Sequence, residues 1–302
     1  MSVTNFCSAD AQNASAIRAK VTFQTLQEKK QSGRPITALT AYDYATARLV
    51  DEAGVDLILV GDSLAQVVLG YDTTLPVTVD EMLHHTRAVR RAVKHAIVAA
   101  DMPYGSYQMG VQDGVTNAVR FMKEAGAEAV KIEGGANRAE LVERLADAEV
   151  PVIGHLGLTP QSVHRMGGYK VQGKSLSAAD TLLKDALALE SAGAVLIVLE
   201  GMPREVAQHI TQRLNIPTIG IGAGPDCDGQ ILVFHDLVNL SFGKPAKFVR
   251  RYGDAATLFR SAIDGYVRDV ERRDFPSEDE SYHMPKEVRG AFEASVPLRR
   301  KA

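Results

Sequence analysis

The sequence has little cysteine, no tryptophan and no long apolar run. Its two cysteines, Cys7 and Cys227, match neither a disulfide framework nor the spacing of a zinc site, so we expect inert thiols in a reducing compartment. No stretch approaches the roughly 18 consecutive apolar residues of a membrane-spanning helix, and residues 1–20 lack the apolar centre of a secretory signal. An organelle address is the alternative, but arginine is scarce in this segment. We therefore expect a cytoplasmic protein with no membrane partner.

An excess of one charge is also missing. Lys and Arg number 34 and Asp and Glu 37, so the net charge is −3 and no strong field exists to recruit a nucleic acid or an anionic membrane. Hydrophobic residues make up 45% of the 302 residues, which is enough for a full core. A length of this order suits one barrel domain of roughly 250 residues with peripheral ends.

Three segments share one design, in which a helix ends at a glycine and a short apolar strand then ends at a carboxylate. The segments cover residues 51–62, 123–133 and 190–200. Glycine supplies the left-handed backbone that ends a helix, and a β-branched run of this length fits a parallel strand covered on both faces. The glycines Gly54, Gly126 and Gly193 lie about seventy residues apart, which is roughly the length of two βα units of a barrel.

Five further short apolar runs, separated by helix-length stretches, raise the number of expected strands to eight. These runs are 36–40, 96–100, 150–154, 217–221 and 230–234. Eight alternating βα units favour an α/β fold of the closed (β/α)8 TIM-barrel type over a doubly wound sheet.

The chain is expected to have three parts. Residues 1–19 read as a flexible N-terminal extension, residues 20–275 as the barrel catalytic domain, and residues 276–302 as a C-terminal tail of Pro, acidic and then basic residues. Within the barrel, the glycine-rich loop over residues 159–177 is long for a βα connection, so we expect it to be a lid or binding loop.

Ionisable residues follow nearly every expected strand. Because the carboxyl ends of barrel strands converge at one mouth, these side chains should meet there. They are Asp43, Asp62, Asp101, Glu133, His155, Glu200, His235 and Asp236. Carboxylates packed together repel one another, so a cation, a proton or a basic partner must accompany them.

Three of these acids, Asp62, Asp101 and Glu133, follow the second, third and fourth strands. Hard oxygen ligands with no cysteine nearby suit Mg2+, which keeps open positions for water or substrate. The alternative for each acid alone is an N-cap on the following helix. Lys131 lies two residues before Glu133, so both side chains should point into the barrel, where Lys131 could be a charge partner or could neutralise a substrate oxygen.

Glu200 ends an apolar strand, where desolvation would raise its pKa and suit it for proton transfer. It is the candidate base. His155 could orient substrate or be a hydrogen-bonded structural histidine. The pair His84 and His85 reads as a solvated helix face. The glycine run over residues 220–224 lacks full dinucleotide spacing and favours close approach of a ligand or a loop to the backbone.

Eight blocks of the sequence, in order, resemble one known family. They lie at residues 40–44, 60–64, 71–76, 100–103, 130–135, 154–162, 167–173 and 219–232. The Lys-x-Glu-Gly-Gly block and the His-Leu-Gly-Leu-Thr-Pro-Gln-Ser block are nearly specific by themselves. Together the blocks closely resemble ketopantoate hydroxymethyltransferase, a family with a barrel of the phosphoenolpyruvate/pyruvate type, and they cover about residues 20–283.

The resemblance implies transfer of a hydroxymethyl group from methylenetetrahydrofolate to 3-methyl-2-oxobutanoate, which gives ketopantoate for pantothenate biosynthesis. It implies that Asp62, Asp101 and Glu133 serve a Mg2+ site, directly or through water, and that Mg2+ stabilises an enolate of the keto acid. Ser63 and Lys131 would join Asp62 and Asp101 in substrate binding. Glu200 would be the catalytic base, and the protein would be a homo-oligomer, as the family suggests a homodecamer.

The chain departs from the family pattern in the loop that carries His164 and Arg165, and at Gly201–Met202 after the base. Two other functions remain open on the sequence. One is the enolate chemistry of phosphoenolpyruvate mutases and isocitrate lyases, although their Lys-Lys-Cys-Gly-His-like block is missing here. The other is a silent barrel that binds a metabolite or a partner, which would have no physical reason to keep mutually repelling acids.

Overall fold

A computed structural model describes residues 18–295 of the chain. Its contacts divide the chain into two compact units, Met1–Tyr252 and Gly253–Ala302. The first unit contains a barrel, and the second contains two helices, α11 (Ala255–Arg272) and α12 (Lys286–Ser295). Of the N-terminal extension that the sequence predicts, residues 1–17 lie outside the described residues. Arg18, assigned to that extension, donates hydrogen bonds to the backbone carbonyls of Asp51, Gly54 and Val55.

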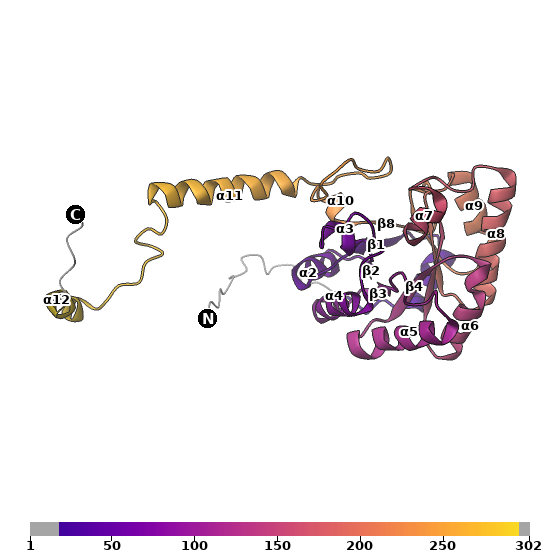
Figure 1. The fold of residues 1–302 in the computed structure, drawn as a ribbon, viewed down its shortest axis with the longest axis horizontal. Helices are drawn as coiled ribbons and strands as arrows, with labels where there is room; N and C mark the ends of the chain where they lie inside the picture. Colours follow the sequence, from indigo (N-terminus) through magenta and orange to yellow (C-terminus); the bar gives the residue numbers. More distant parts are fainter. Residues whose placement is uncertain (1–17, 296–302) are drawn as a thin grey trace. The chain divides into compact units, whose positions relative to one another are not determined.

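Eight parallel strands pair in chain order and close into a barrel, with β1 paired to β8 (Figure 1). They are β1 (Ile36–Thr40), β2 (Leu57–Val60), β3 (Ile97–Asp101), β4 (Ala129–Glu133), β5 (Val152–Gly157), β6 (Leu196–Glu200), β7 (Thr218–Ile221) and β8 (Gly229–Leu232). The expected (β/α)8 fold is confirmed.

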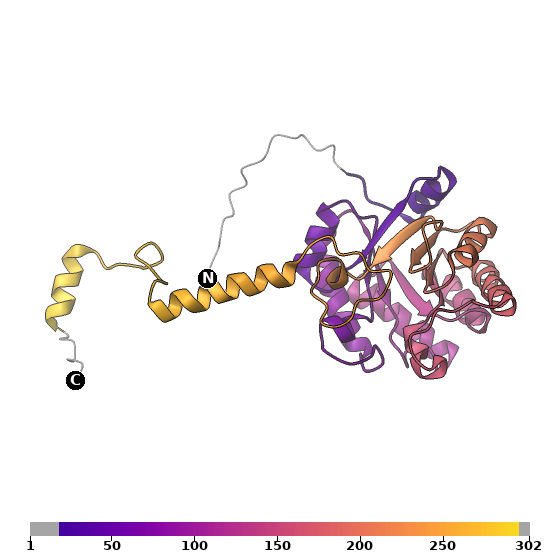
Figure 2. The same ribbon diagram turned by 90° about the horizontal axis from the view of Figure 1, so that it is seen from above.

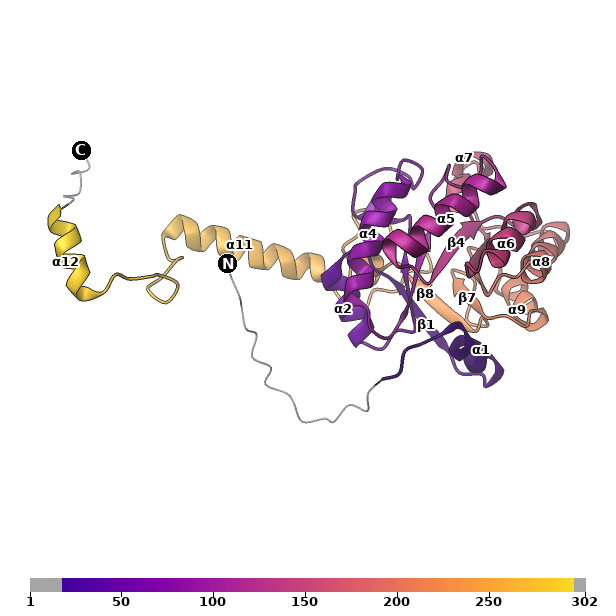
Figure 3. The same ribbon diagram turned by 90° about the horizontal axis from the view of Figure 1, so that it is seen from below.

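Helices surround the strands (Figures 2 and 3). In the barrel unit they are α1 (Phe23–Gln31), α2 (Tyr44–Glu52), α3 (Leu64–Val67), α4 (Val79–Ala92), α5 (Val111–Ala125), α6 (Ala139–Asp147), α7 (Val163–Met166), α8 (Leu176–Ser191), α9 (Arg204–Arg213) and α10 (Phe234–Leu237), with 3-10 turns η1 (Ala136–Arg138) and η2 (Pro160–Ser162). The helix α5 ends as the sequence predicts, because Gly126 takes the left-handed conformation at its C-cap.

Alternation along the strands separates two apolar layers. On β2, Leu57 and Leu59 belong to a cluster inside the barrel, whereas Ile58 and Val60 belong to the cluster between strands and helices. Side chains two residues apart share a face, so each strand contributes one row to the interior. The helix α1 places Leu26 in the interior cluster. The interior is therefore a packed core, and only its carboxyl end can offer space for chemistry.

Acids at the opposite end, where the strands begin, are matched with donors. Asp56, Glu128 and Asp228 each stand one residue before a strand. Each accepts a hydrogen bond from a backbone N–H of the neighbouring strand and pairs with a lysine at 2.6–2.8 Å; the backbone donors are Thr37, Val98 and Thr218, and the lysines are Lys29, Lys20 and Lys30. These acids bind the start of one strand to the next.

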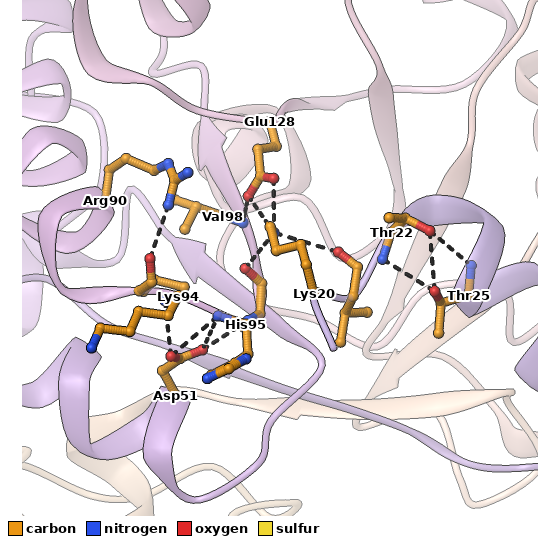
Figure 4. A network of polar contacts seen from close by, with 12 residues as sticks. Lys20, Thr22, Thr25, Asp51, Arg90, Lys94, His95, Val98 and Glu128 are labelled. Carbon is orange, nitrogen blue, oxygen red and sulfur yellow. Dashed lines mark hydrogen bonds and ion pairs between the residues drawn. The ribbon is translucent and has the colours of Figure 1, made fainter. Parts of the chain in front are cut away.

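Asp51, at the end of α2, continues this pattern (Figure 4). Its carboxylate accepts hydrogen bonds from the backbone N–H groups of Lys94, His95 and Ala96, which precede β3. Burial raises the pKa of Asp51, but the three backbone donors outweigh it, and the net pKa lies below the usual value. The charged carboxylate therefore stabilises the entry to β3.

The second unit begins earlier than the sequence suggested. We expected the barrel domain to reach residue 275, but the contacts separate at Tyr252 and Gly253. The helix α11 has the periodicity of a core helix, yet none of its residues is buried. Its exposed apolar side chains include Leu258, Ile263 and Tyr266. Within the described residues, no helix combines the length and apolar character needed to cross a membrane.

Candidate active site

The candidate site lies at the carboxyl end of the inward-facing rows of strand side chains. Inward-facing apolar residues such as Ala99, Ala129 and Val198 are followed, two or four positions later, by ionisable ones. Asp101 ends β3, Lys131 and Glu133 lie on β4, His155 on β5, and Glu200 ends β6. Because the period of a strand is two residues, these side chains continue the same inward rows at the mouth. The predicted convergence is thus found.

Asp62 and Asp101 lie side by side at the mouth. The Oδ2 atom of Asp101 accepts the backbone N–H of Asp62 at 2.9 Å, and Asp62 is 4% exposed. Burial raises the pKa of Asp62 well above its usual value, and the charges of Asp101 and Glu133 raise it further. Neither acid caps a helix, so the N-cap alternative does not apply to them.

Lys131 supplies a buried positive charge. Its Nζ lies 3.1 Å from Oδ1 of Asp101. Burial alone would lower the pKa of Lys131, but the charges of Asp101, Glu133 and Asp62 outweigh burial, and the pKa is raised. Lys131 is therefore a cation among the acids at neutral pH.

His155 lies between two acids. Its Nδ1 is 3.3 Å from Oε1 of Glu133, and its Nε2 is 3.1 Å from Oε2 of Glu200. Burial and Lys131 lower the pKa of His155, but hydrogen bonding to the two acids raises it to about 9. The Nζ of Lys131 also lies 3.1 Å from Nδ1 of His155. Because both nitrogens of a protonated imidazole are donors, His155 can then donate toward both acids but cannot accept from Lys131, which pairs with Asp101 instead. His155 thus connects the metal-binding candidates to the candidate base.

Glu200 is the most accessible acid of this group. Its side chain is 17% exposed, against 4% for Asp101 and Glu133, and it follows the buried residues Val198 and Leu199. Access to the cavity on one side and an apolar strand on the other suit a group that exchanges protons with a bound substrate.

Two buried carboxylate oxygens, Oδ1 of Asp101 and Oε1 of Glu133, lack a well-oriented hydrogen bond within residues 18–295. Each has one basic atom nearby, Nζ of Lys131 at 3.1 Å and Nδ1 of His155 at 3.3 Å. Four carboxylates of this group therefore share two basic side chains, which favours a further cation beside them. Among the described residues, no three His, Cys, Asp or Glu side chains are grouped closely enough to hold a metal alone. The arrangement fits Mg2+, which is commonly bound by one or two carboxylates with water and substrate as the other ligands.

Ser63 lines the same cavity. Its hydroxyl lies 2.8 Å from the hydroxyl of Tyr42, whose pKa is raised, mainly by burial. The cavity has a volume of about 200 Å3, and it also contains Asp62, Asp101, Lys131, Glu133, His155 and Glu200. All six residues assigned to catalysis, substrate or metal therefore line one small cavity, which suits a small molecule, whereas His235 does not line it.

Sequence reasoning missed the residues that hold the acids in place. The side chain of Gln161 donates to Oδ2 of Asp62 at 2.9 Å, and its backbone N–H donates to Oε2 of Glu133 at 3.0 Å. Tyr107 donates its hydroxyl proton to Gln161 and accepts the backbone N–H of Glu133. Gln161 lies in one of the blocks that carry the family resemblance, so the sequence could have indicated it. Nothing in the sequence indicated Tyr107.

Other candidates from the sequence have different places. Asp43 is an N-cap, because it accepts the backbone N–H of Thr46 at the start of α2. His84 is exposed on α4, as predicted for a solvated helix face, whereas His85 is half-buried and its Nδ1 lies 2.6 Å from the backbone carbonyl of Tyr42. The loop over 159–177 brings Tyr169 to the cavity, as expected for a binding loop.

The glycine run allows close packing of a loop rather than nucleotide binding. A Cβ at Gly222 would lie 2.5 Å from the ring of Phe248, which lines the cavity. Gly222 and Gly224 also have positive φ angles of 62° and 83°. The run therefore lets neighbouring segments approach the backbone at the mouth.

Solved structures share this fold. The crystal structure of 2,3-dimethylmalate lyase, a member of the phosphoenolpyruvate mutase/isocitrate lyase superfamily, aligns with a TM-score of 0.56 and 16% identity over 91% of this chain and 93% of that chain. Phosphonopyruvate hydrolase in complex with oxalate and Mg2+ aligns with a TM-score of 0.54 and 17% identity over 91% and 97% of the two chains. These likenesses establish the barrel type that was expected.

Sequence relatives are much closer. The 3-methyl-2-oxobutanoate hydroxymethyltransferase of Koribacter versatilis is 67% identical over 91% of this chain and 94% of its own length, and that of Geobacter sulfurreducens is 54% identical over 88% and 99%. The family model described as ketopantoate hydroxymethyltransferase matches residues 20–278. With the site geometry described above, these matches show that the chain is an enzyme of the ketopantoate hydroxymethyltransferase family.

Proposed function

We propose that the enzyme transfers a one-carbon unit from methylenetetrahydrofolate to 3-methyl-2-oxobutanoate by way of an enolate, with Mg2+ as cofactor, in pantothenate biosynthesis. Water supplies the new hydroxyl group, and tetrahydrofolate and ketopantoate are the products. The observation that carries the proposal is the cavity of about 200 Å3, in which four carboxylates share the two basic side chains Lys131 and His155.

The keto acid would bind where positive charge and hydroxyl donors meet. Lys131 is placed to pair with the substrate carboxylate, and Ser63 to donate a hydrogen bond from the other side of the cavity. Asp62 and Asp101 would hold Mg2+, with Glu133 contributing directly or through water. When bound, Mg2+ would withdraw electron density from the keto oxygen and stabilise the charge that develops as C3 loses its proton.

Glu200 would remove the proton from C3. A base at the end of β6 and a cation site at the ends of β2 and β3 lie across the mouth from each other, so a small keto acid can reach both. His155, 3.1 Å from Glu200, would orient the carboxylate and stabilise its charged form. Mg2+ also accompanies oxalate, a two-oxygen chelator, in the related phosphonopyruvate hydrolase barrel, which supports the same use of this mouth.

The test is product formation by the purified protein. We expect ketopantoate, detected by mass spectrometry, only when 3-methyl-2-oxobutanoate, methylenetetrahydrofolate and Mg2+ are all present. Carbon–carbon cleavage of a 2-hydroxy diacid or phosphonate chemistry without folate would instead assign the barrel to the mutase and lyase reactions. A folded protein with neither activity would favour a silent, metabolite-binding barrel.

We further propose that the protein is a cytoplasmic homo-oligomer, with a decamer as the family expectation. Two apolar surfaces support association. In the barrel unit, a groove of about 670 Å3 beside β1 and β8 is lined by Leu39, Leu232 and Tyr252 among others. In the second unit, α11 leaves Leu258, Ile263 and other apolar residues exposed. Association of copies would bury such surfaces, and sedimentation of the full chain measures the size of the assembly.

A further inference from the structure

A second cavity opens directly beside the proposed keto acid site. Its volume is about 650 Å3, whereas the inner cavity has about 200 Å3. The two cavities share four lining residues, which are Ser63, Gln66, Val233 and Asp236. The inner cavity can hold a five-carbon acid but not a pterin with its aminobenzoyl group, and the outer cavity falls in the usual size range for a drug-sized ligand.

We propose that this outer groove, between the β2–α3 segment and the loop over residues 239–251, binds the folate co-substrate. The inference rests on the proposed function, and it gives the place at which the enzyme would bind the one-carbon donor. Its inner end meets the keto acid at Ser63 and Asp236, so a methylene group carried there can reach the C3 carbanion.

The chemistry of the lining matches the three parts of a folate. Tyr71 and Phe242 are aromatic and exposed, and they can stack on a pterin or aminobenzoyl ring. Asp236, at the inner end, can accept from the amino group of a pterin. Ser241 offers a hydroxyl that is buried and has no hydrogen-bond partner among the described residues. The groove therefore has both apolar and polar groups available.

Positive charge stands toward the loop side of the groove. Lys244 and Arg251 both line it, and neither has an ion-pair partner within the part of the chain that the structure describes. The glutamate portion of a folate carries carboxylates, for which such cations are suitable partners. We expect these two residues to contact the glutamate tail.

The barrel order also favours this side of the mouth. Ser63 follows β2 and Glu200 ends β6, four strands away in a closed barrel of eight. The donor would then enter opposite the base, and the two groups would not compete for space at the substrate carbon.

A cavity of about 680 Å3 on the β4–β5 side is the main alternative. It contains Arg138 and Arg165, and it shares Glu133 and His155 with the inner cavity. Those two shared residues are 5% and 2% exposed and stand 3.3 Å apart, so they form a wall instead of a passage. The residues shared with the proposed groove are only partly buried or exposed, which leaves that route open.

The experiment compares two double variants of the full chain. Lys244→Ala/Arg251→Ala removes the groove cations, and Lys247→Ala/Arg250→Ala removes two exposed cations of the same loop that do not line the groove. We expect the first to raise the KM for methylenetetrahydrofolate and the dissociation constant of tetrahydrofolate about 5- to 10-fold, since each exposed ion pair is worth up to about fivefold. The KM for the keto acid should change less than about twofold in both. A triglutamate tail should tighten wild-type binding more than it tightens binding to the groove variant.

Several results separate this inference from the proposed function. Unchanged folate binding in the groove variant, an equal loss in the control variant, or a loss in Arg165→Ala instead would overturn the groove. Tetrahydrofolate that binds in a manner sensitive to Lys244 and Arg251, without any ketopantoate being formed, would support the groove and reject the proposed reaction.

Discussion

The two ends of the barrel hold their acids in different surroundings. Where the strands begin, Asp56 and Asp228 each accept a backbone N–H and pair with a lysine. At the mouth, Asp101 and Glu133 have buried oxygens that lack a well-oriented hydrogen bond, and burial and neighbouring charge raise the pKa of Asp62. At the strand starts each acid has its own lysine, whereas at the mouth four carboxylates share two basic side chains, Lys131 and His155. The same residue types thus stabilise the fold at one end and favour binding of a further cation at the other.

Replacement of the base should give the largest effect. We expect Glu200→Gln to slow exchange of the C3 proton of 3-methyl-2-oxobutanoate with D2O by about 10^2- to 10^4-fold, because a positioned base contributes an amount of this order. Proton NMR of the keto acid in the presence of Mg2+ measures the rate. Binding of the keto acid should persist in this variant, and exchange at the wild-type rate would remove Glu200 from the role of base.

Removal of a mouth acid should eliminate stabilisation by the metal. For the wild type, Mg2+ and keto acid at about 100 times their dissociation constant should raise the free energy of unfolding by about 2.7 kcal/mol. Asp101→Ala should lose this increment while it still folds, because the buried Asp101 carboxylate is a proposed ligand of the metal. Thermal melts with and without Mg2+ give the comparison. A full increment in the variant would contradict the metal assignment.

The same change at the other end should affect stability instead. Asp228→Ala leaves the backbone N–H of Thr218 without its acceptor and Lys30 without its carboxylate partner, so we expect a loss of about 2 kcal/mol in the free energy of unfolding. Urea denaturation measures this loss. The kcat of the molecules that remain folded should match the wild type, and a large fall in kcat at normal stability would break the comparison between the two ends.

Replacement of Asp51 should give the smallest effect, and its cost in the free energy of unfolding should depend on pH. Burial raises its pKa, but three backbone donors bring the net pKa below the usual value, so the folded state binds the proton less tightly than the unfolded state. Its stabilisation is then present above pH about 4 and is lost as the pH falls through the lowered pKa. Asp51→Asn should cost about 1 kcal/mol at pH 7, and the difference from wild type should shrink at pH 3. A difference independent of pH in urea denaturation would reject this account.

The sequence predicts the barrel well because its strands are short apolar runs between helices. The first strand, 36–40, is confirmed at both ends. Other strand ends shift by one to three residues, since polar residues such as Asp101 and His155 extend the strands beyond the apolar runs. The last strand was expected at 230–234 but ends at Leu232, because Phe234 begins α10.

The sequence predicts those site residues whose position follows from the end of a strand. Strand-end acids must converge in a barrel, so Asp62, Asp101, Glu133 and Glu200 could be named from their places in the sequence. The bond between Tyr107 and Gln161 joins loops 54 residues apart, and it depends on packing that no local pattern encodes. Likewise, the periodicity of α11 predicts an apolar face that packs against another surface, but none of its residues is buried, and the periodicity does not identify that surface.

The most direct test of the account is exchange of the C3 proton of 3-methyl-2-oxobutanoate without folate, followed with a chelator and then with added Mg2+. If the mouth acids hold a cation that activates the keto acid, exchange by the wild type should stop on chelation and return with Mg2+. Exchange that continues unchanged in the chelator would contradict the central claim, because the acids at the mouth would then activate the keto acid without a metal.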